Sequence, residues 1–343
     1  MFGSPTLRQL APLLALVLGA LALQQLLPQY FLYVGNLLMM YVILVIGLDL
    51  LIGWSGQFAF AHIAFFGIGI YATTILGTRY DLPFLIAMPV AAMLAGAVGF
   101  LIAFPATRLR AVYLALATFA FAECAQWVAR TWDSVTKGAD GLQIPPTSIL
   151  GYAVGNDQHA FPVVAIILAL VLAATLYLQR SRFARSMSAI RESEHVASAS
   201  GIDVKRVKIL SFTLSAIYAG VAGGVYTLFN SFVNPDILGV AQLVLVLTML
   251  VVGGSGSIAG CVLGAVLIGI LPEVLRAAPR SMLVWQEFFY GLILVLAIMF
   301  MPRGFFGAWQ AWRDRARHAA DKRDAQASQD TRLRAKASTE ASS

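Results

Sequence analysis

Ionisable residues are rare inside the apolar runs of this chain, and three of them could carry chemistry: Asp49, His62 and Glu123. A charge inside a bilayer costs about 2.5–3.5 kcal/mol on insertion scales, so such side chains face a protein interior or a cavity rather than lipid. They could line a substrate path, or they could cap a broken helix or bind backbone amides. Their small number and uneven placement argue against a proton relay.

A second candidate site is a motif that occurs twice, at an offset of 200 residues. Residues 50–70 and 250–270 are identical at eight positions, namely Leu50, Gly53, Ser55, Gly56, Ala59, Ile68, Gly69 and Ile70. The discriminating part is GxSG, which the second copy carries as Gly253, Gly254, Ser255 and Gly256. Glycine-rich interruptions in both halves of a transporter indicate broken helices that line or gate the path. The alternative is two tight turns left by an ancient duplication.

No set of residues predicts an enzyme. The chain lacks HExxH and P-loop motifs, and its GxSG sequences lack the second half of a GxSxG nucleophile elbow. Cys124 and Cys261 lie inside apolar runs without CxxC spacing, which predicts buried, inert thiols and no metal site. We therefore expect no cofactor, and any nucleotide hydrolysis must come from another chain.

The elements that position these residues follow from composition. Hydrophobic residues make up 59% of the chain and charged residues 12%, which is far more apolar than a soluble domain. Runs of about 20 apolar residues can cross a bilayer. Ten candidates occur, the first interpreted as a span and not a removed signal peptide: 8–27, 34–52, 58–78, 83–104, 111–130, 160–179, 207–232, 239–252, 258–275 and 284–302. The predicted fold class is all-α and polytopic, with about ten transmembrane or partly re-entrant helices.

The distribution of Lys and Arg predicts the orientation. If the chain starts in the cytoplasm, inner segments hold 19 of these residues and outer segments five. Both termini and both GxSG motifs are then cytoplasmic. We expect a transmembrane domain at 1–302, with 131–159 as a possible outer cap, and a charged, partly disordered tail at 303–343. Topology and anionic lipid, rather than nucleic acid, explain the net charge of +7.

The most charged internal segment is 180–208, with seven Lys or Arg and three acids. Its position between two spans predicts a cytoplasmic docking surface. Small residues such as Ala197 and Gly201 would let a partner approach, and the charges would fix its register. A flexible solvated loop is the alternative.

Four segments together resemble one family. They are GLDLLIGWSGQFAFAHIAFFGIGIYA (47–72), VYLALATFAFAE (112–123) leading to TKGADGL (136–142), the loop SMSAIRESEHVASASGIDVKRVK, and VVGGSGSIAGCVLGA (251–265). These segments look like the permease subunits of branched-chain amino acid ABC importers. The resemblance is closest to the LivM-type permease of the pair and covers most of 35–302.

The resemblance implies a subunit of the bacterial inner membrane that pairs with a second, related permease. It also implies two cytoplasmic ATPases, an external substrate-binding protein and a coupling helix near 186–201 in an ATPase groove. The coupling residues would be Arg191, Glu192, Glu194, Ala197 and Gly201. Glu194 sits one residue early against the general importer pattern, and Ile209-Leu210-Ser211-Phe212 replaces its Ile-x-Leu-Pro.

The expected cargo is a branched-chain or other hydrophobic amino acid. The same machine could instead carry urea, short amides or aromatic acids. An ion-driven secondary transporter is a third hypothesis, for which Asp49 and Glu123 would have to belong to a coordinated carboxylate cluster.

Overall fold

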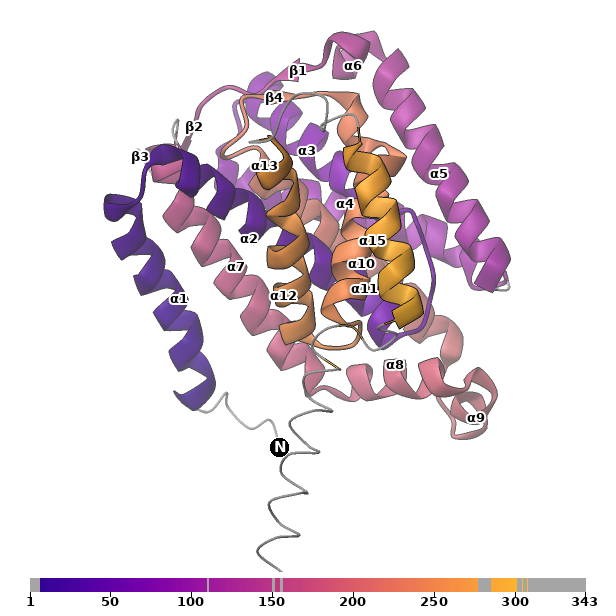
Figure 1. Ribbon diagram of the computed structural model, residues 1–343. Helices are drawn as coiled ribbons and strands as arrows, with labels where there is room; N and C mark the ends of the chain where they lie inside the picture. Colours follow the sequence, from indigo (N-terminus) through magenta and orange to yellow (C-terminus); the bar gives the residue numbers. More distant parts are fainter. Residues whose placement is uncertain are drawn as a thin grey trace, which may run out of the picture.

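The structure, a computed structural model, describes residues 7–109, 111–149, 152–154, 157–276, 285–300, 304 and 307. Apolar helices run up and down between the two ends of a bundle (Figure 1). They are α1 (Leu7–Leu26), α2 (Gln29–Asp49), α3 (His62–Arg79), α4 (Phe84–Ala106), α5 (Ala111–Thr131), α7 (Asp157–Gln179), α10 (Val204–Tyr226), α11 (Val240–Gly253), α12 (Ile258–Gly269), α13 (Leu271–Arg276) and α15 (Gln286–Phe300). Within these residues, five helices are long and apolar enough to cross a membrane, and shorter apolar helices accompany them. The predicted all-helical, polytopic class is confirmed.

Nine of the ten predicted runs coincide with one helix each, and the run 258–275 is divided between α12 and α13. Two other runs begin or end differently from the prediction. The run 58–78 becomes helical only at His62, and the run 207–232 ends as a helix at Tyr226. The second run is cut because 227–239 holds turn-forming residues and a short 3-10 helix, η3 (Pro235–Leu238). Apart from Gly304 and Gly307, the predicted tail 303–343 lies outside the described residues.

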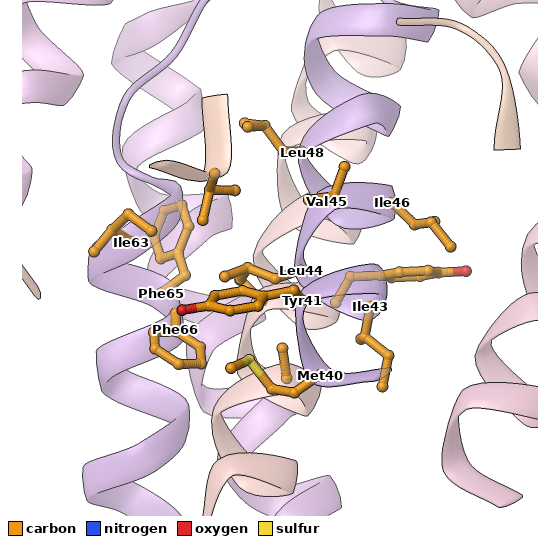
Figure 2. Packing of buried hydrophobic residues seen from close by; sticks show 14 of the residues in the cluster. Met40, Tyr41, Ile43, Leu44, Val45, Ile46, Leu48, Ile63, Phe65 and Phe66 are labelled. Carbon is orange, nitrogen blue, oxygen red and sulfur yellow. The ribbon is translucent and has the colours of Figure 1, made fainter. Parts of the chain in front are cut away.

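The core is built around α2, whose sequence is apolar on all sides. In the apolar stretch of Gln29–Trp54, 89% of the residues are buried inside the protein, against 22% for α5. Figure 2 shows side chains projecting from α2 in several directions, with Phe65 and Phe66 of α3 on one of its sides. A helix that is hydrophobic all round belongs inside a bundle.

The peripheral helix α5 corrects one sequence prediction. Cys124 on α5 is exposed, whereas Cys261 on α12 is buried. The prediction of two buried thiols is therefore wrong for Cys124, because an apolar run at the edge of the bundle has an outward face as well as an inward one.

Small residues allow α10 to lie directly against its neighbours, as their four-residue spacing predicts. A Cβ on Gly220 would lie 2.8 Å from the Cα of Ala92 in α4, and one on Gly99 would lie 2.5 Å from the Cβ of Ala216. Lipid provides no hydrophobic drive between helices, so such close backbone packing is what stabilises the bundle.

The end of the bundle opposite α8 is covered by short elements. These are α6 (Asp133–Thr136), η2 (Gly138–Asp140), β1 (Leu142–Gln143), β2 (Thr147–Ile149), β3 (Tyr152–Val154) and β4 (Phe232–Val233). The strands form two antiparallel pairs, β1 with β4 and β2 with β3. Arg130 and Asp236 form an ion pair of 2.5 Å between α5 and η3.

The charged segment 180–208 forms two helices, not the single helix predicted at 186–201. α8 (Arg182–Glu192) and α9 (Glu194–Ala199) are separated by Ser193, whose backbone is extended (φ −163°, ψ 118°). The hydroxyl of Ser193 accepts from Val196 N–H, so this residue caps the second helix as it breaks the first. The capping serine ends one helix and starts the next, which the prediction of one continuous helix did not take into account.

Candidate functional site

The two GxSG segments meet at the end of the bundle where α8 lies (Figure 1). The first follows a π-helical turn, η1 (Leu50–Trp54), that extends α2. The second forms the turn between α11 and α12, with positive φ at Gly254 and Gly256. A Cβ on Gly53 would lie 2.5 Å from the amide nitrogen of Gly256, so the two backbones are in direct contact. Both segments are thus on one side of the bundle, which excludes a simple inverted repeat.

The Asp49 carboxylate is the centre of this junction. Asp49 is 2% exposed, and its Oδ1 accepts a 2.7 Å hydrogen bond from Gly256 N–H. The Trp54 indole and the Cys261 thiol lie close to the same carboxylate. Polar groups from η1, from the α11–α12 turn and from α12 therefore surround one buried carboxylate, and the Gly256 hydrogen bond offsets part of its loss of hydration.

Arg191 joins α8 to the same junction. Its Nη1 donates to the carbonyl oxygen of Gly53. The stem of Arg191 lies over Gly56, where a Cβ would be 3.2 Å from Cγ, and its Nη1 is 3.0 Å from the Cβ position of Gly256. One side chain of α8 thus contacts both GxSG segments. A cavity of about 400 Å³ beside it is lined by Trp54, Gln179, Arg185 and Glu192, among others.

The non-helical segment between η1 and α3 is held by Gln57. Its amide donates to Ser55 Oγ at 2.9 Å and to Ser211 Oγ of α10 at 3.0 Å. Three residues later, Phe60 N–H donates to Thr118 Oγ1 of α5 at 2.9 Å. The segment is an ordered break with its own partners rather than a loose loop.

The other predicted path residues lie apart from Asp49. His62, 1% exposed at the start of α3, is hydrogen bonded to the Leu44 carbonyl and to Ser215. Glu123 lies half-buried on α5, which packs against α3, η2 and η3. The structure therefore brings Asp49 together with both GxSG motifs and does not bring Glu123 to them.

The predicted coupling residues separate into two groups. Arg191, Glu192 and Glu194 are all exposed residues, but the Arg191 side chain reaches Gly53 of the bundle, and Glu194 forms a 2.6 Å ion pair with Lys208. Gly201 has φ +81° and open space around it. Ala197 is 2% exposed. The expectation that it faces a partner is corrected, because α9 turns this position onto its own chain.

Sequence reasoning missed Trp54, Gln57, Cys261 and Ser211 as members of the junction. A signal for Gln57 was available in the repeat, because positions 57 and 257 are both polar within apolar surroundings. Ser257 caps α12 by accepting from Gly260 N–H, while Gln57 anchors the break before α3. Position 261 aligns with Ala61, so the repeat gave no sign of the thiol.

The fold and this junction define a polytopic helical membrane protein whose buried polar centre holds segments together. Among the described residues, no group of three or more His, Cys, Asp and Glu could hold a metal ion. Residues 30–298 match the family described as branched-chain amino acid transport system, permease component. The chain belongs to this family and is a transport subunit rather than an enzyme.

Similar proteins carry names that fit this family. The chain is 30% identical over 323 residues to the high-affinity branched-chain amino acid permease protein LivM of Escherichia coli, covering 87% of this chain and 75% of that protein. It is 30% identical over 182 residues to LivH of the same organism, covering 51% and 58%. A probable LivM of Methanocaldococcus jannaschii is 23% identical over 239 residues, covering 64% and 67%. No solved structure matches the chain.

Proposed function

We propose that this chain is a membrane subunit of an ATP-driven importer of branched-chain amino acids in a bacterial inner membrane. Its partners would be a second, related permease, two cytoplasmic ATPases and an external substrate-binding protein. Membership of the permease family supports this assignment, as do the names of the LivM and LivH relatives.

The structural observation that best supports the proposal is the distribution of buried and exposed residues on α8 and α9. On α8, Ala184, Met187 and Ile190 are buried against the chain, while Arg182 and Arg185 are exposed. The unit is therefore an amphipathic element that rests on the end of the bundle and presents a basic face. A partner that moves it would act on the junction beneath, through Arg191.

In this mechanism, ATP binding closes the partner ATPases and displaces α8 and α9. The shift in the equilibrium between the two states cannot exceed the difference in the free energy with which the nucleotide binds them. The GxSG segments and Asp49 would gate the path at this end, switching the cavity from outward to inward facing. The chain itself needs no nucleotide site.

Reconstitution tests the proposal. In liposomes, the isolated chain should not accumulate leucine, even with a proton or sodium gradient. Adding the second permease, the ATPases, the binding protein and ATP should produce uptake of leucine, isoleucine and valine. Uptake of urea, a short amide or an aromatic acid instead would reassign the cargo. Gradient-driven accumulation by the isolated chain would overturn the ABC assignment and make Asp49 and Glu123 the residues to neutralise.

Orientation is tested with single cysteines in a background without Cys124 and Cys261. Arg185→Cys should be labelled by an impermeant maleimide only from the cytoplasmic side, because α8 is expected there. Trp132→Cys, at the other end of the bundle, should be labelled only from outside. The reverse pattern would contradict the assignment of α8 to the ATPases.

A further inference from the structure

We infer that Asp49 and Arg191 are the positioning residues that link α8 mechanically to both halves of the bundle. Arg191 would transfer a displacement of α8 to the end of α2, and Asp49 would transfer it onward to the α11–α12 turn. The inference rests on the proposed function, since it assumes that a partner moves α8.

The first contact is a cap on a helix end. Gly53 lies in the last turn of the α2–η1 helix, where carbonyl groups have no following helical N–H to accept. After η1, the amides of Gly56 and Gln57 donate to the carbonyl groups of Ile52 and Leu51, not to that of Gly53. Arg191 fills this position, and a cation at a helix C-terminus is also favoured by the helix dipole.

The second contact crosses from the first half of the chain to the second. Gly256, 207 residues after Asp49, gives its N–H to the Asp49 carboxylate. Separating the turn from α2 would leave the buried carboxylate without this donor, which is unfavourable, so the two segments are expected to move together.

The residues of this link are in close contact. A side chain on Gly53 would collide with Asp49 Oδ1, and Arg191 is in van der Waals range of the Cβ positions of Gly56 and Gly256. A cavity of about 400 Å³ lies beside Arg191, but the contacts of this side chain with the two GxSG backbones are direct, so a shift of α8 would act on them without an intervening group. Arg191 belongs to an exposed segment, whereas Asp49 is buried, so α8 provides the input and the bundle the response.

The first test measures the link in the purified full chain, independently of any substrate. Hydrogen exchange is followed in peptides covering the second GxSG turn, residues 250–261, after Arg191→Met. We expect exchange there to accelerate about tenfold, because loss of the first contact loosens the second. Arg185→Met is the matched control, since Arg185 lies on the same helix and lines the same cavity. Unchanged exchange in Arg191→Met, or equal acceleration in the control, would overturn the inference.

The second test measures coupling in the complete transporter. Arg191→Met and Asp49→Ala should each lower leucine uptake per ATP hydrolysed about tenfold, with the complex still assembled. Arg191→Lys should recover part of the loss, because it restores a donor for Gly53. Since the contacts act in series, the double variant should be no worse than the poorer single variant. Multiplied losses would mean two independent contacts and would contradict the link. A wild-type complex without uptake would refute the proposed function, while the exchange test would still judge the link.

Discussion

His62 and Ser215 lie 153 residues apart in the chain, and the imidazole Nδ1 is 3.0 Å from the serine hydroxyl oxygen. The other ring nitrogen, Nε2, is 2.9 Å from the Leu44 carbonyl oxygen, which can only accept. Nε2 therefore donates, and Nδ1 accepts from Ser215. Both nitrogens of a neutral ring are used to join α2, α3 and α10.

This bonding predicts a structural effect of replacing His62. His62→Phe keeps an aromatic ring but leaves the Ser215 hydroxyl without this buried partner. We expect a loss of about 1–3 kcal/mol of stability, seen as a lower thermal unfolding temperature of the purified chain in detergent. His195→Phe, at an exposed position of α9, should leave the unfolding temperature unchanged. An unaltered temperature for His62→Phe would show that the two hydrogen bonds contribute little.

The contact between α10 and α4 predicts intolerance of bulk at Gly220. Gly220→Val would push side-chain atoms into the backbone of Ala92, 2.8 Å from the new Cβ. Overpacking costs about 1–3 kcal/mol where side chains can yield, and here the obstacle is backbone. We expect little monodisperse protein after detergent extraction. Gly291→Val is the control, because nothing lies within 4 Å of that position. Equal yields would contradict the close crossing.

Gly256 and Gly201 both have a positive φ, but we expect their substitution to have different effects on transport. Gly256→Ala and Gly201→Ala both force a side chain into the left-handed region, at about 1–2 kcal/mol. Only Gly256 also faces Arg191, 3.0 Å from the new Cβ, whereas Gly201 is open. Transport by the complete complex should therefore fall strongly for Gly256→Ala and little for Gly201→Ala, with assembly retained in both. Similar losses would mean that backbone strain alone decides.

Burial on α9 predicts which position can crosslink to an ATPase. Val196 is 66% exposed, and its neighbour Ala197 is 2% exposed. In cysteine-free complexes, Val196→Cys should form a disulfide with a cysteine introduced in the partner groove. Ala197→Cys should not, and it serves as the matched control. Crosslinking through Ala197→Cys alone would show that α9 rotates when the complex forms.

Much of the fold follows from hydrophobic runs, because membrane helices must satisfy their backbone internally and must be apolar over a fixed length. The ends of α3 and α10 were harder to predict. Hydropathy gives no information on the extended segment that Gln57 holds or on the turn after Tyr226. Those breaks depend on side-chain partners more than 50 residues away, such as Ser211 for Gln57.

The candidate site was predictable in its parts and not in its assembly. The repeat marked both GxSG motifs, and Asp49 was conspicuous as a charge in an apolar run. Their contact is tertiary, so spacing along the chain could not indicate it. Arg191 shows the same limit. Its charge suggested contact with a cytoplasmic partner, whereas the structure shows this long side chain reaching Gly53 from beside the buried face of α8.

The burial of α2 also sets an order for making the protein. At about 5–20 residues per second, Gly256 leaves the ribosome about 10–40 s after Asp49, since 207 residues separate them. During that interval, the most enclosed helix of the finished molecule still lacks α12, and its carboxylate lacks the Gly256 donor. The nascent chain must then keep α2 beside the insertion machinery, or let water reach Asp49, until the last third of the chain arrives. The arrival of the α11–α12 turn, rather than insertion of the early helices, is therefore the event that completes the contacts of Asp49.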